Sequence, residues 1–421
     1  MINAQQLDLT TSALAQVLTF RQPADVVLSA FFRRERKLGM RDRQEIAETV
    51  FATIRHLQKI QKMLPKPHQK PRRAALAALV LGRGISVHGV ESLCDSEEKQ
   101  WLIDVKEQKS AFASDLTTAA ELPQWLIECL QQQGWDDNQI ATYGRSVMQP
   151  APLDVRVNTQ KGKRDKILSA LQAEGLRAEA TPFSPWGIRL FDKPALNKHP
   201  LFLDGVLEVQ DEGSQLLALL TGVKRGQIAV DFCAGAGGKT LAMGAMMAGS
   251  GRLYAFDVAE KRLANMKPRM VRAGLTNIHP QRIDNEHDAR IARLKHKADC
   301  VLVDAPCSGM GTLRRNPDLK YRQSNDNIRT LLEQQQSILQ AASELVRPGG
   351  RLVYATCSIL ETENQQQLNN FLAANTGWHI EPVQTLLKSN VLPDMQGNYL
   401  QLNTGEHHTD GFFAAVLTRI K

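Results

Sequence analysis

From Gly226 to the end of the chain, apolar segments of β-strand length alternate with segments of helical periodicity. Four strands are predicted, at residues 228–232, 253–257, 299–304 and 351–355. Helices are predicted at 261–273 and 331–346, and the second is expected to end at Arg347-Pro348-Gly349-Gly350. Strands that alternate with helices form a parallel, doubly wound sheet, in which ligands bind beyond the carboxyl ends of the strands. The sequence therefore predicts an α/β catalytic domain over residues 223–421.

Two further domains are predicted before this one. Residues 1–120 have helical periodicity and are expected to form an all-helical domain. Residues 121–222 begin with two short predicted helices, and Pro150-Ala151-Pro152 marks a break after them. Predicted strands at 153–159, 188–191 and 206–210 then surround an amphipathic helix at 163–173. We interpret residues 121–222 as a small α/β module of the kind that binds RNA.

The chain carries a moderate excess of positive charge. Its 421 residues have a formal net charge of +8, which suits a polyanionic partner such as nucleic acid. A basic run lies in the helical region and comprises Arg33, Arg34, Arg36, Lys37, Arg41 and Arg43. Such a run either contacts phosphates or forms a solvated helix face, and the sequence leaves both open.

Six cysteines are spread along the chain, and no two of them form a Cys-x-x-Cys pair. We therefore expect neither a metal site nor a redox dithiol. The low cysteine density and the lack of a secretory leader indicate the reducing cytoplasm. No apolar stretch approaches the roughly 20 residues that span a bilayer, so no membrane partner is expected.

A glycine-rich loop follows the first predicted strand of the catalytic domain. It reads Cys233-Ala234-Gly235-Ala236-Gly237-Gly238-Lys239-Thr240, which matches neither the Walker loop nor a complete Gly-x-Gly-x-x-Gly. Asp257 ends the second strand, where a carboxylate can accept both hydroxyl hydrogens of a ribose. Asp284 is expected at the end of a third strand, where it can accept from an adenine amino group. The combination favours an adenosyl cofactor, although the loop alone also permits a structural turn or a dinucleotide oxidoreductase.

Two cysteines follow strands of the same domain. Cys307 lies in Asp304-Ala305-Pro306-Cys307-Ser308-Gly309, and Cys357 lies in Tyr354-Ala355-Thr356-Cys357-Ser358. A lone cysteine is most often a small buried apolar residue, and we read Cys94, Cys129 and Cys300 in this way. Two thiols beside a nucleotide loop instead predict that one thiol adds to a substrate while the other helps to remove a proton.

These motifs resemble the paired signatures of the NOL1/NOP2/Sun family. Three other segments agree with the family pattern: Arg156-Val157-Asn158-Thr159, residues 209–215 and Asp410-Gly411-Phe412-Phe413. The resemblance covers residues 122–421 and is strongest to the bacterial Sun-type, RsmB-like rRNA methyltransferases. It implies that residues 1–120 form a NusB-like RNA-binding domain. The chain departs from the family's Cys-Ala-Ala-Pro-Gly-Gly-Lys-Thr at Gly235 and Ala236, where small residues are nevertheless retained.

The resemblance implies a Rossmann-like class I methyltransferase that uses S-adenosyl-L-methionine to methylate C5 of cytosine in RNA. The expected substrate is small-subunit 16S rRNA or an assembly intermediate, with tRNA as the nearest alternative. The family pattern makes Cys357 the nucleophile and Cys307 the group that helps to remove the C5 proton. Asp304 is expected to bind both the base and the cofactor region, and Lys239 to support the catalytic groups. Residues 233–239, Asp257 and Asp284 are the expected cofactor-binding residues.

Two other functions compete with this prediction. DNA cytosine-5 methyltransferases use the cysteine of a Pro-Cys pair as nucleophile, but the Glu-Asn-Val motif that accompanies it is absent, and Cys357 would have no role. A non-catalytic ribosome-assembly protein could keep the fold, although it would have no need for Lys239, Asp304 and both cysteines.

Overall fold

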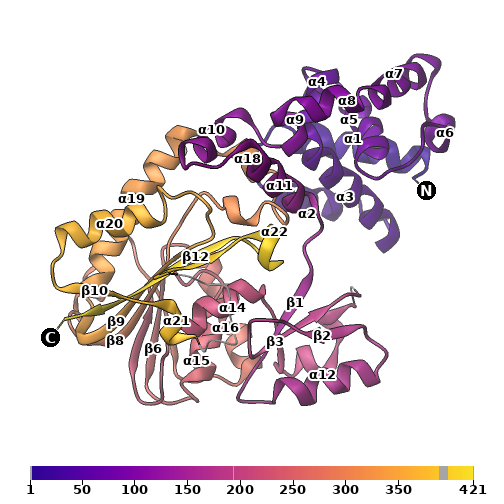
Figure 1. Ribbon diagram of the computed structural model, residues 1–421. Helices are drawn as coiled ribbons and strands as arrows, with labels where there is room; N and C mark the ends of the chain where they lie inside the picture. The colour runs from indigo at the N-terminus through magenta and orange to yellow at the C-terminus, as the bar shows by residue number, and fades with distance from the viewer. Residues whose placement is uncertain (1, 193, 388–396, 421) are drawn as a thin grey trace. The chain divides into compact units, whose positions relative to one another are not determined.

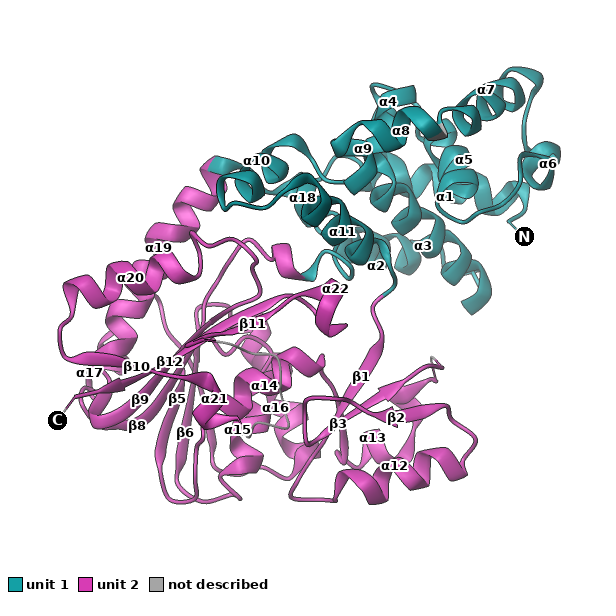
Figure 2. Cartoon of the chain, in the orientation of Figure 1, with its two compact units in different colours: residues 1–150, 312–325 teal, residues 151–311, 326–421 magenta. Residues whose placement is uncertain are grey.

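The computed structural model describes residues 2–192, 194–387 and 397–420 (Figure 1). The chain divides into two compact units, residues 1–150 with 312–325 and residues 151–311 with 326–421 (Figure 2). The first unit is helical, and the second contains both β-sheets. The helices of residues 121–149 lie in the helical unit, and the three-domain division expected from the sequence stays a prediction.

The helical unit consists of α-helices of 4 to 16 residues. Its α-helices are α1 (Ala4–Val17), α2 (Ala24–Arg34), α3 (Met40–Arg55), α4 (Leu57–Met63), α5 (Pro71–Leu81), α6 (Val87–Val90), α7 (Ser96–Glu107), α8 (Lys109–Ser114), α9 (Leu116–Ala120), α10 (Gln124–Gln132), α11 (Asp137–Met148) and α18 (Leu319–Arg322). Reciprocal capping boxes begin α1, α7 and α11, because each N-cap side chain accepts from the third helical residue, whose own side chain accepts from the cap. Alanine-rich α5 is buried from Ala74 to Val80 and forms the centre of this unit's core.

Residues 312–325 pack in the helical unit, although their neighbours along the chain lie in the other one. The buried Lys320 ammonium donates to the backbone oxygen of Glu121. Asp318 accepts from the backbone N–H of Ala24 at the start of α2, and the Arg55 guanidinium donates to the backbone of Arg314. Burial lowers the pKa of Lys320 to about 8. These bonds fix the segment that follows the Cys307 motif in a polar, largely buried setting.

The second unit begins with a four-stranded antiparallel sheet in the order β2-β3-β1-β4. Its elements are β1 (Leu153–Val157), α12 (Arg164–Ala173), β2 (Ala178–Ala180), β3 (Gly187–Leu190), α13 (Pro200–Leu203) and β4 (Leu207–Val209). Helix α12 covers one face through Ile167 and Leu171. The sequence predicted three of these strands and the helix, but missed the short β2.

The larger sheet has the order β10-β12-β9-β8-β5-β6-β7, and β11 pairs with β12. Its strands are β5 (Ile228–Asp231), β6 (Arg252–Asp257), β7 (Ile278–Arg282), β8 (Ala298–Asp304), β9 (Val346–Thr356), β10 (Trp378–Glu381), β11 (Leu400–Leu402) and β12 (Phe412–Arg419). Strands β5 to β9 run parallel, whereas β10, β11 and β12 enter antiparallel ladders. The order reverses between β5 and β8, and such a switch point opens a crevice for ligands.

Helices cover both faces of this sheet. They are α14 (Glu212–Leu220), α15 (Gly238–Met246), α16 (Glu260–Ala273), α17 (Ala289–Ala292), α19 (Asn325–Ser343), α20 (Gln365–Ala374), α21 (Val383–Leu386) and α22 (Thr404–His407). Alternate residues of each strand enter separate cores: Ala414 packs with the α14–α16 side, and Phe413 with the α19–α20 side. Every helix among residues 2–192, 194–387 and 397–420 is too short or too polar to cross a membrane.

The prediction for the end of α19 was wrong. The helix ends at Ser343, and residues 347–350 belong to β9 instead of closing the helix. Val346 already pairs with Ala298 of β8, and the register between the two strands shifts before Cys300. This irregularity accommodates a Pro-Gly-Gly segment inside a ladder, which the local sequence alone would read as a turn.

Candidate active site

A cavity of about 540 Å³ lies at the carboxyl ends of β5, β6 and β8. Its lining includes the glycine-rich loop and brings Asp257, Asp304, Cys307 and Cys357 together. These residues are up to 124 positions apart in the chain, but the parallel strands end at one edge of the sheet. The structure therefore gathers in one place most of the site residues that the sequence predicts.

The glycine-rich loop joins β5 to α15 and wraps the cavity. Gly237 has a φ of 88°, and a Cβ on it would lie 2.5 Å from Cγ of Met266, so only glycine fits there. Asp257 fixes the loop from the next strand, because its carboxylate accepts from the backbone N–H groups of Gly235 and Ala259, both at 2.7 Å. The loop and the acid at the end of β6 thus form one hydrogen-bonded wall.

Asp231, at the end of β5, is a cavity residue that the sequence analysis did not assign to the site. One of its carboxylate oxygens accepts from the Thr240 hydroxyl at 2.7 Å, while the other is buried without a hydrogen-bond partner among the described residues. Burial raises the pKa of Asp231 to about 7. A buried oxygen that has no hydrogen-bond partner and lies beside a cavity can accept a hydrogen bond from a polar group of a ligand. The sequence signal for Asp231 was its place two residues before the glycine-rich loop.

The two candidate catalytic thiols are adjacent. Sγ of Cys307 lies 3.3 Å from Sγ of Cys357. Cys307 follows β8 and Cys357 follows β9, and these strands are parallel neighbours with Asp304 paired to Ala355. The hydrogen bond to Cys357, together with burial, raises the pKa of the Cys307 thiol well above its ordinary value. The Cys307 thiol therefore holds its proton more firmly than an ordinary cysteine thiol does.

Lys239 and Asp304 form an ion pair beside the thiols. The Lys239 Nζ lies 2.7 Å from Oδ2 of Asp304, and the Asp304 side chain is 29% exposed. Burial lowers the pKa of Lys239, but the charge and hydrogen bond of Asp304 outweigh burial and leave it raised. Lys239 therefore stays protonated and holds one carboxylate oxygen, while the Asp304 side chain remains accessible to a ligand.

The small sheet supports this cavity through the Arg156-Val157-Asn158 element. The buried Arg156 donates from Nε to the side-chain oxygen of Gln210, which lines the cavity. Asn158 donates to the backbone oxygens of Gly205 and Ala273, at 3.1 and 2.9 Å. Both residues thus fasten the small sheet to the elements that surround the cofactor loop.

The structure does not bring Asp284 into the cavity. Its carboxylate is exposed and pairs with Arg282 and Arg290, at 3.1 and 3.5 Å. Ile283 and Glu286 line the cavity instead. The sequence located the end of β7 correctly within a few residues, but the chain turns after Ile283 and points the acid towards the arginines.

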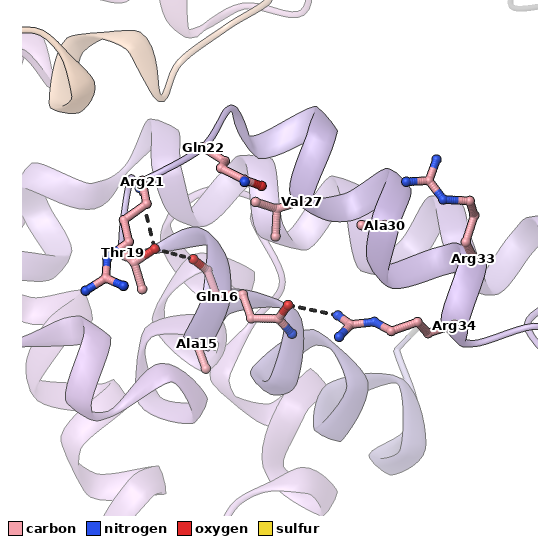
Figure 3. A pocket seen from close by; sticks show the side chains of 9 residues that line it. All are labelled: Ala15, Gln16, Thr19, Arg21, Gln22, Val27, Ala30, Arg33 and Arg34. Carbon is pink, nitrogen blue, oxygen red and sulfur yellow. Dashed lines mark hydrogen bonds between the residues drawn. The ribbon is translucent and has the colours of Figure 1, made fainter.

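The basic run of the helical unit is largely exposed. Arg33 and Arg34 end α2 and line a hollow of about 600 Å³ together with Arg21 and Gln16 (Figure 3). Arg34 donates to the Gln16 side chain at 2.8 Å, and Arg33 donates to Ser29 at 3.1 Å. No ion pair joins these three arginines to a carboxylate of the described residues. Their charge is available to an external anion.

The strand order, the glycine-rich loop and the acid at the end of β6 define a Rossmann-like, S-adenosylmethionine-dependent methyltransferase. The family model described as 16S rRNA methyltransferase RsmB/F matches residues 218–418. A model for the ferredoxin-like domain of the same group matches residues 122–196. The chain belongs to this RsmB/F methyltransferase family.

Related proteins support the assignment. The chain is 35% identical to the probable ribosomal RNA small subunit methyltransferase B of Synechocystis, over 70% of this chain and 66% of that protein. It is 30% identical to ribosomal RNA small subunit methyltransferase B of Pseudomonas syringae, over 91% of each chain. The crystal structure of PH0851 has a TM-score of 0.78 at 24% identity and covers 99% of both chains, which shows the shared fold. A methyltransferase homologue from Pyrococcus horikoshii matches 71% of this chain and all of its own, with a TM-score of 0.58 and 26% identity.

The residues of the cavity fit S-adenosylmethionine. The cavity is large enough for a ligand of this class, and the orphaned oxygen of Asp231 offers a partner to a polar group. Asp257 and the loop residues 233–239 would hold the cofactor, which supplies an electrophilic methyl group.

Replacing Asp257 with asparagine is expected to weaken S-adenosylmethionine binding about 10- to 100-fold, because charge-assisted hydrogen bonds contribute about 1.5–3 kcal/mol. Isothermal titration calorimetry on the folded variant measures this change. Asp284→Asn is the matched control, since Asp284 lies outside the cavity lining, and its dissociation constant should stay within about threefold of the parent's. Equal losses in the two variants would contradict a specific role for Asp257.

Proposed function

We propose that this protein methylates C5 of a cytosine in small-subunit rRNA through a covalent bond between Cys357 and C6 of the base. The observation that carries the proposal is the pair of thiols 3.3 Å apart beside the Lys239–Asp304 ion pair, at the mouth of the cofactor loop. Cytosine C5 is a poor nucleophile, and addition of a thiolate to C6 makes electron density available at C5. The RsmB/F family membership supports RNA as the substrate.

The two thiols have different roles in the proposed reaction: Cys357 adds to the base, and Cys307 removes the C5 proton. Cys357 releases its thiol proton to solvent and its sulfur adds to C6, so that C5 can take the methyl group. C5 then carries both a methyl group and a hydrogen. Cys307 in turn releases its own thiol proton to solvent, and the resulting thiolate takes the C5 hydrogen as a proton. Loss of this proton restores the C5–C6 double bond and expels Cys357 as a thiolate.

The electrostatics of the pair suit this order of events. The hydrogen bond that Cys307 donates to Cys357 is the largest cause of the raised pKa of Cys307, followed by burial and the charge of Cys357. Once Cys357 is a neutral thioether, its hydrogen bond and charge no longer raise the pKa of Cys307. Cys307 therefore becomes more easily deprotonated at the stage when a base is needed.

Asp304 and Lys239 act on the base. The accessible carboxylate of Asp304 can accept from the cytosine amino group, and Lys239 holds the other carboxylate oxygen in place. The positive charge of Lys239 favours the negative charge that builds on the ring during thiolate addition. The target base must leave its stack to reach the thiols, so we propose a flipped or single-stranded cytosine.

Bisulfite mapping of total RNA from cells with and without the gene tests the substrate. We expect one 16S rRNA cytosine to lose its 5-methyl signal in the deletion strain. The wild-type gene should restore the signal, and the Cys357→Ala gene should not. Loss of a tRNA signal instead would support cytosine-5 methylation but show that tRNA is the substrate. An unchanged RNA methylation profile would contradict the proposed function. Action on rRNA also places the protein in the cytoplasm under this proposal.

Arg33 and Arg34 are proposed to contact RNA phosphates, because they are exposed and unmatched by carboxylates. Each lost phosphate contact lowers the slope of log K against log salt by about 0.7–0.9. The Arg33→Gln/Arg34→Gln variant should therefore lose about 1.5 from that slope and bind rRNA more weakly at low salt. Arg329→Gln, which removes an exposed arginine paired with Asp326, is the control. Equal salt slopes for the wild type and the double variant would refute phosphate contacts at this place.

A further inference from the structure

A buried carboxylate, Glu363, holds the loop that carries Cys307. Glu363 is 0% exposed and lies between the Cys357 motif and α20. Its Oε1 accepts from the backbone N–H of Ser308 at 2.8 Å, and its Oε2 accepts from the Ser308 hydroxyl at 2.5 Å. Ser308 directly follows Cys307, so both carboxylate oxygens fix the backbone beside that thiol.

Gln335 of α19 connects Glu363 to the residue that precedes Cys307 through hydrogen bonds. Its side-chain amide donates to Oε1 of Glu363 at 3.0 Å and to the backbone oxygen of Pro306 at 2.9 Å. The Tyr354 hydroxyl donates to the backbone oxygen of Glu363 at 2.6 Å and ties the carboxylate's own backbone to β9. The residues before and after Cys307 are therefore both fixed by one network.

The next residue, Asn364, holds the loop that carries Cys357. Its side-chain oxygen accepts from the Thr356 hydroxyl at 2.5 Å, and its side-chain nitrogen donates to the backbone oxygen of Ser358 at 3.0 Å. Thr356 and Ser358 flank Cys357. Two consecutive residues of the chain thus fasten the two thiol loops separately.

The two loops also contact each other directly. The Ser308 and Ser358 hydroxyl oxygens lie 3.2 Å apart, and the backbone N–H of Gly311 donates to the backbone oxygen of Cys357 at 2.9 Å. A Cβ on Gly311 would lie 2.0 Å from the backbone oxygen of Gly411, which explains why position 311 is a glycine. The sulfur–sulfur separation therefore depends on a packed and hydrogen-bonded frame.

Glu363 is an unusual residue to bury for stability alone. All of its hydrogen bonds are to neutral donors, and no lysine, arginine or histidine of the described residues pairs with it. Burying a carboxyl side chain costs free energy, which hydrogen-bond donors offset only when they are well aligned. A neutral side chain could fill the same space without that cost. The carboxylate is instead suited to orienting three donors around one loop.

We propose that Glu363 and Asn364 are positioning residues that set the two thiols independently, Glu363 for Cys307 and Asn364 for Cys357. This inference rests on the proposed function, in which the two thiols act in successive steps. Displacement of a reacting group by about 1 Å can lower a rate about 100-fold. Loosening the Cys307 loop should therefore slow release of the base, whereas loosening the Cys357 loop should slow addition to it.

The two substitutions are expected to have opposite effects on the covalent intermediate. Glu363→Gln presents an amide to donors and should lower kcat about 100-fold while the covalent RNA adduct accumulates. Thr356→Val removes the hydroxyl that donates a hydrogen bond to the side-chain oxygen of Asn364. This variant should lower kcat by a similar factor without accumulation of the adduct. Thr356→Ser keeps the hydroxyl and should recover most of the activity. A general loss of packing would not produce this split or this rescue.

The test measures turnover of ordinary rRNA with S-adenosylmethionine, and the adduct fraction on denaturing gels. Glu344→Gln is the matched control, because it removes a carboxylate from an exposed position of the same unit. Ser308→Ala removes one donor to Glu363 and gives a second, milder variant if Glu363→Gln does not fold, as judged by thermal unfolding. It should also raise the adduct fraction.

The outcomes separate the two proposals. Equal adduct fractions in the Glu363, Ser308 and Thr356 variants, with methylation intact in the wild type, would overturn independent positioning and leave the function standing. Failure of the wild type to methylate cytosine and of Cys307→Ala to form an adduct would overturn the proposed function, and the positioning roles with it. Accumulation in the Glu363 or Ser308 variant but not in Thr356→Val would support the inference.

Discussion

Replacing Cys307 with alanine is expected to leave the protein covalently attached to its RNA. Addition of Cys357 to C6 and methyl transfer do not need the Cys307 thiol, but loss of the C5 proton does. The intermediate therefore forms and cannot decay at a normal rate. With S-adenosylmethionine and rRNA, most of the variant should run on a denaturing gel as a protein–RNA species, and multiple-turnover methylation should fall about 1,000-fold or more.

Two controls make this result specific. The wild type should show little adduct under the same conditions, because release follows transfer. A Cys307→Ala/Cys357→Ala double variant should show none. Normal turnover by Cys307→Ala would contradict the role assigned to Cys307, even if the protein proves to methylate cytosine.

Replacing Cys357 with alanine is expected to abolish methylation altogether, by a factor of about 10⁴ or more. Without a nucleophile at C6, C5 stays too electron-poor to take the methyl group. Cys307 is a poor substitute, because its sulfur lies 3.3 Å from the sulfur of Cys357 and follows a different strand, and burial still raises the pKa of its thiol. Transfer of tritium from labelled S-adenosylmethionine into rRNA measures the loss.

The matched control for this variant is Cys94→Ala, which removes a thiol of the helical unit. It should methylate at the parent rate. S-adenosylmethionine affinity should also be unchanged in Cys357→Ala, because the carboxylates and the glycine-rich loop hold the cofactor. Residual methylation above a few per cent in Cys357→Ala would contradict nucleophilic catalysis by this residue.

The sequence predicted the α/β fold and the meeting of the two thiols for one physical reason. Apolar runs followed by polar motifs identify the ends of parallel strands, and all such ends lie at one edge of a doubly wound sheet. Cys307 and Cys357 could therefore be placed together although 50 residues separate them. Asp257 was identified on the same grounds, whereas Lys239 was identified from the glycine-rich loop and the family resemblance.

Other features depend on tertiary contacts that leave no local signal. The bulge that takes residues 347–350 into β9 exists because β8 lies alongside. The residues 312–325 join the helical unit through Lys320 and Asp318, which local periodicity does not reveal. Glu363 looks like an ordinary loop acid in the sequence, and only its donors show that it is buried between the thiol loops. Asp284 was assigned by its position after a strand, but the direction of the following turn decided its partners.

The most direct test of covalent catalysis is the identity of the amino acid that bonds to the base. RNA with 5-fluorocytidine at the target position traps the intermediate in the wild-type protein, because C5 then carries fluorine in place of a removable proton. After nuclease and protease digestion, mass spectrometry locates the modified peptide. We predict a methylated fluorocytidine on the peptide that contains Cys357. The same adduct on Cys307, or a modified RNA with no bond to the protein, would contradict the mechanism.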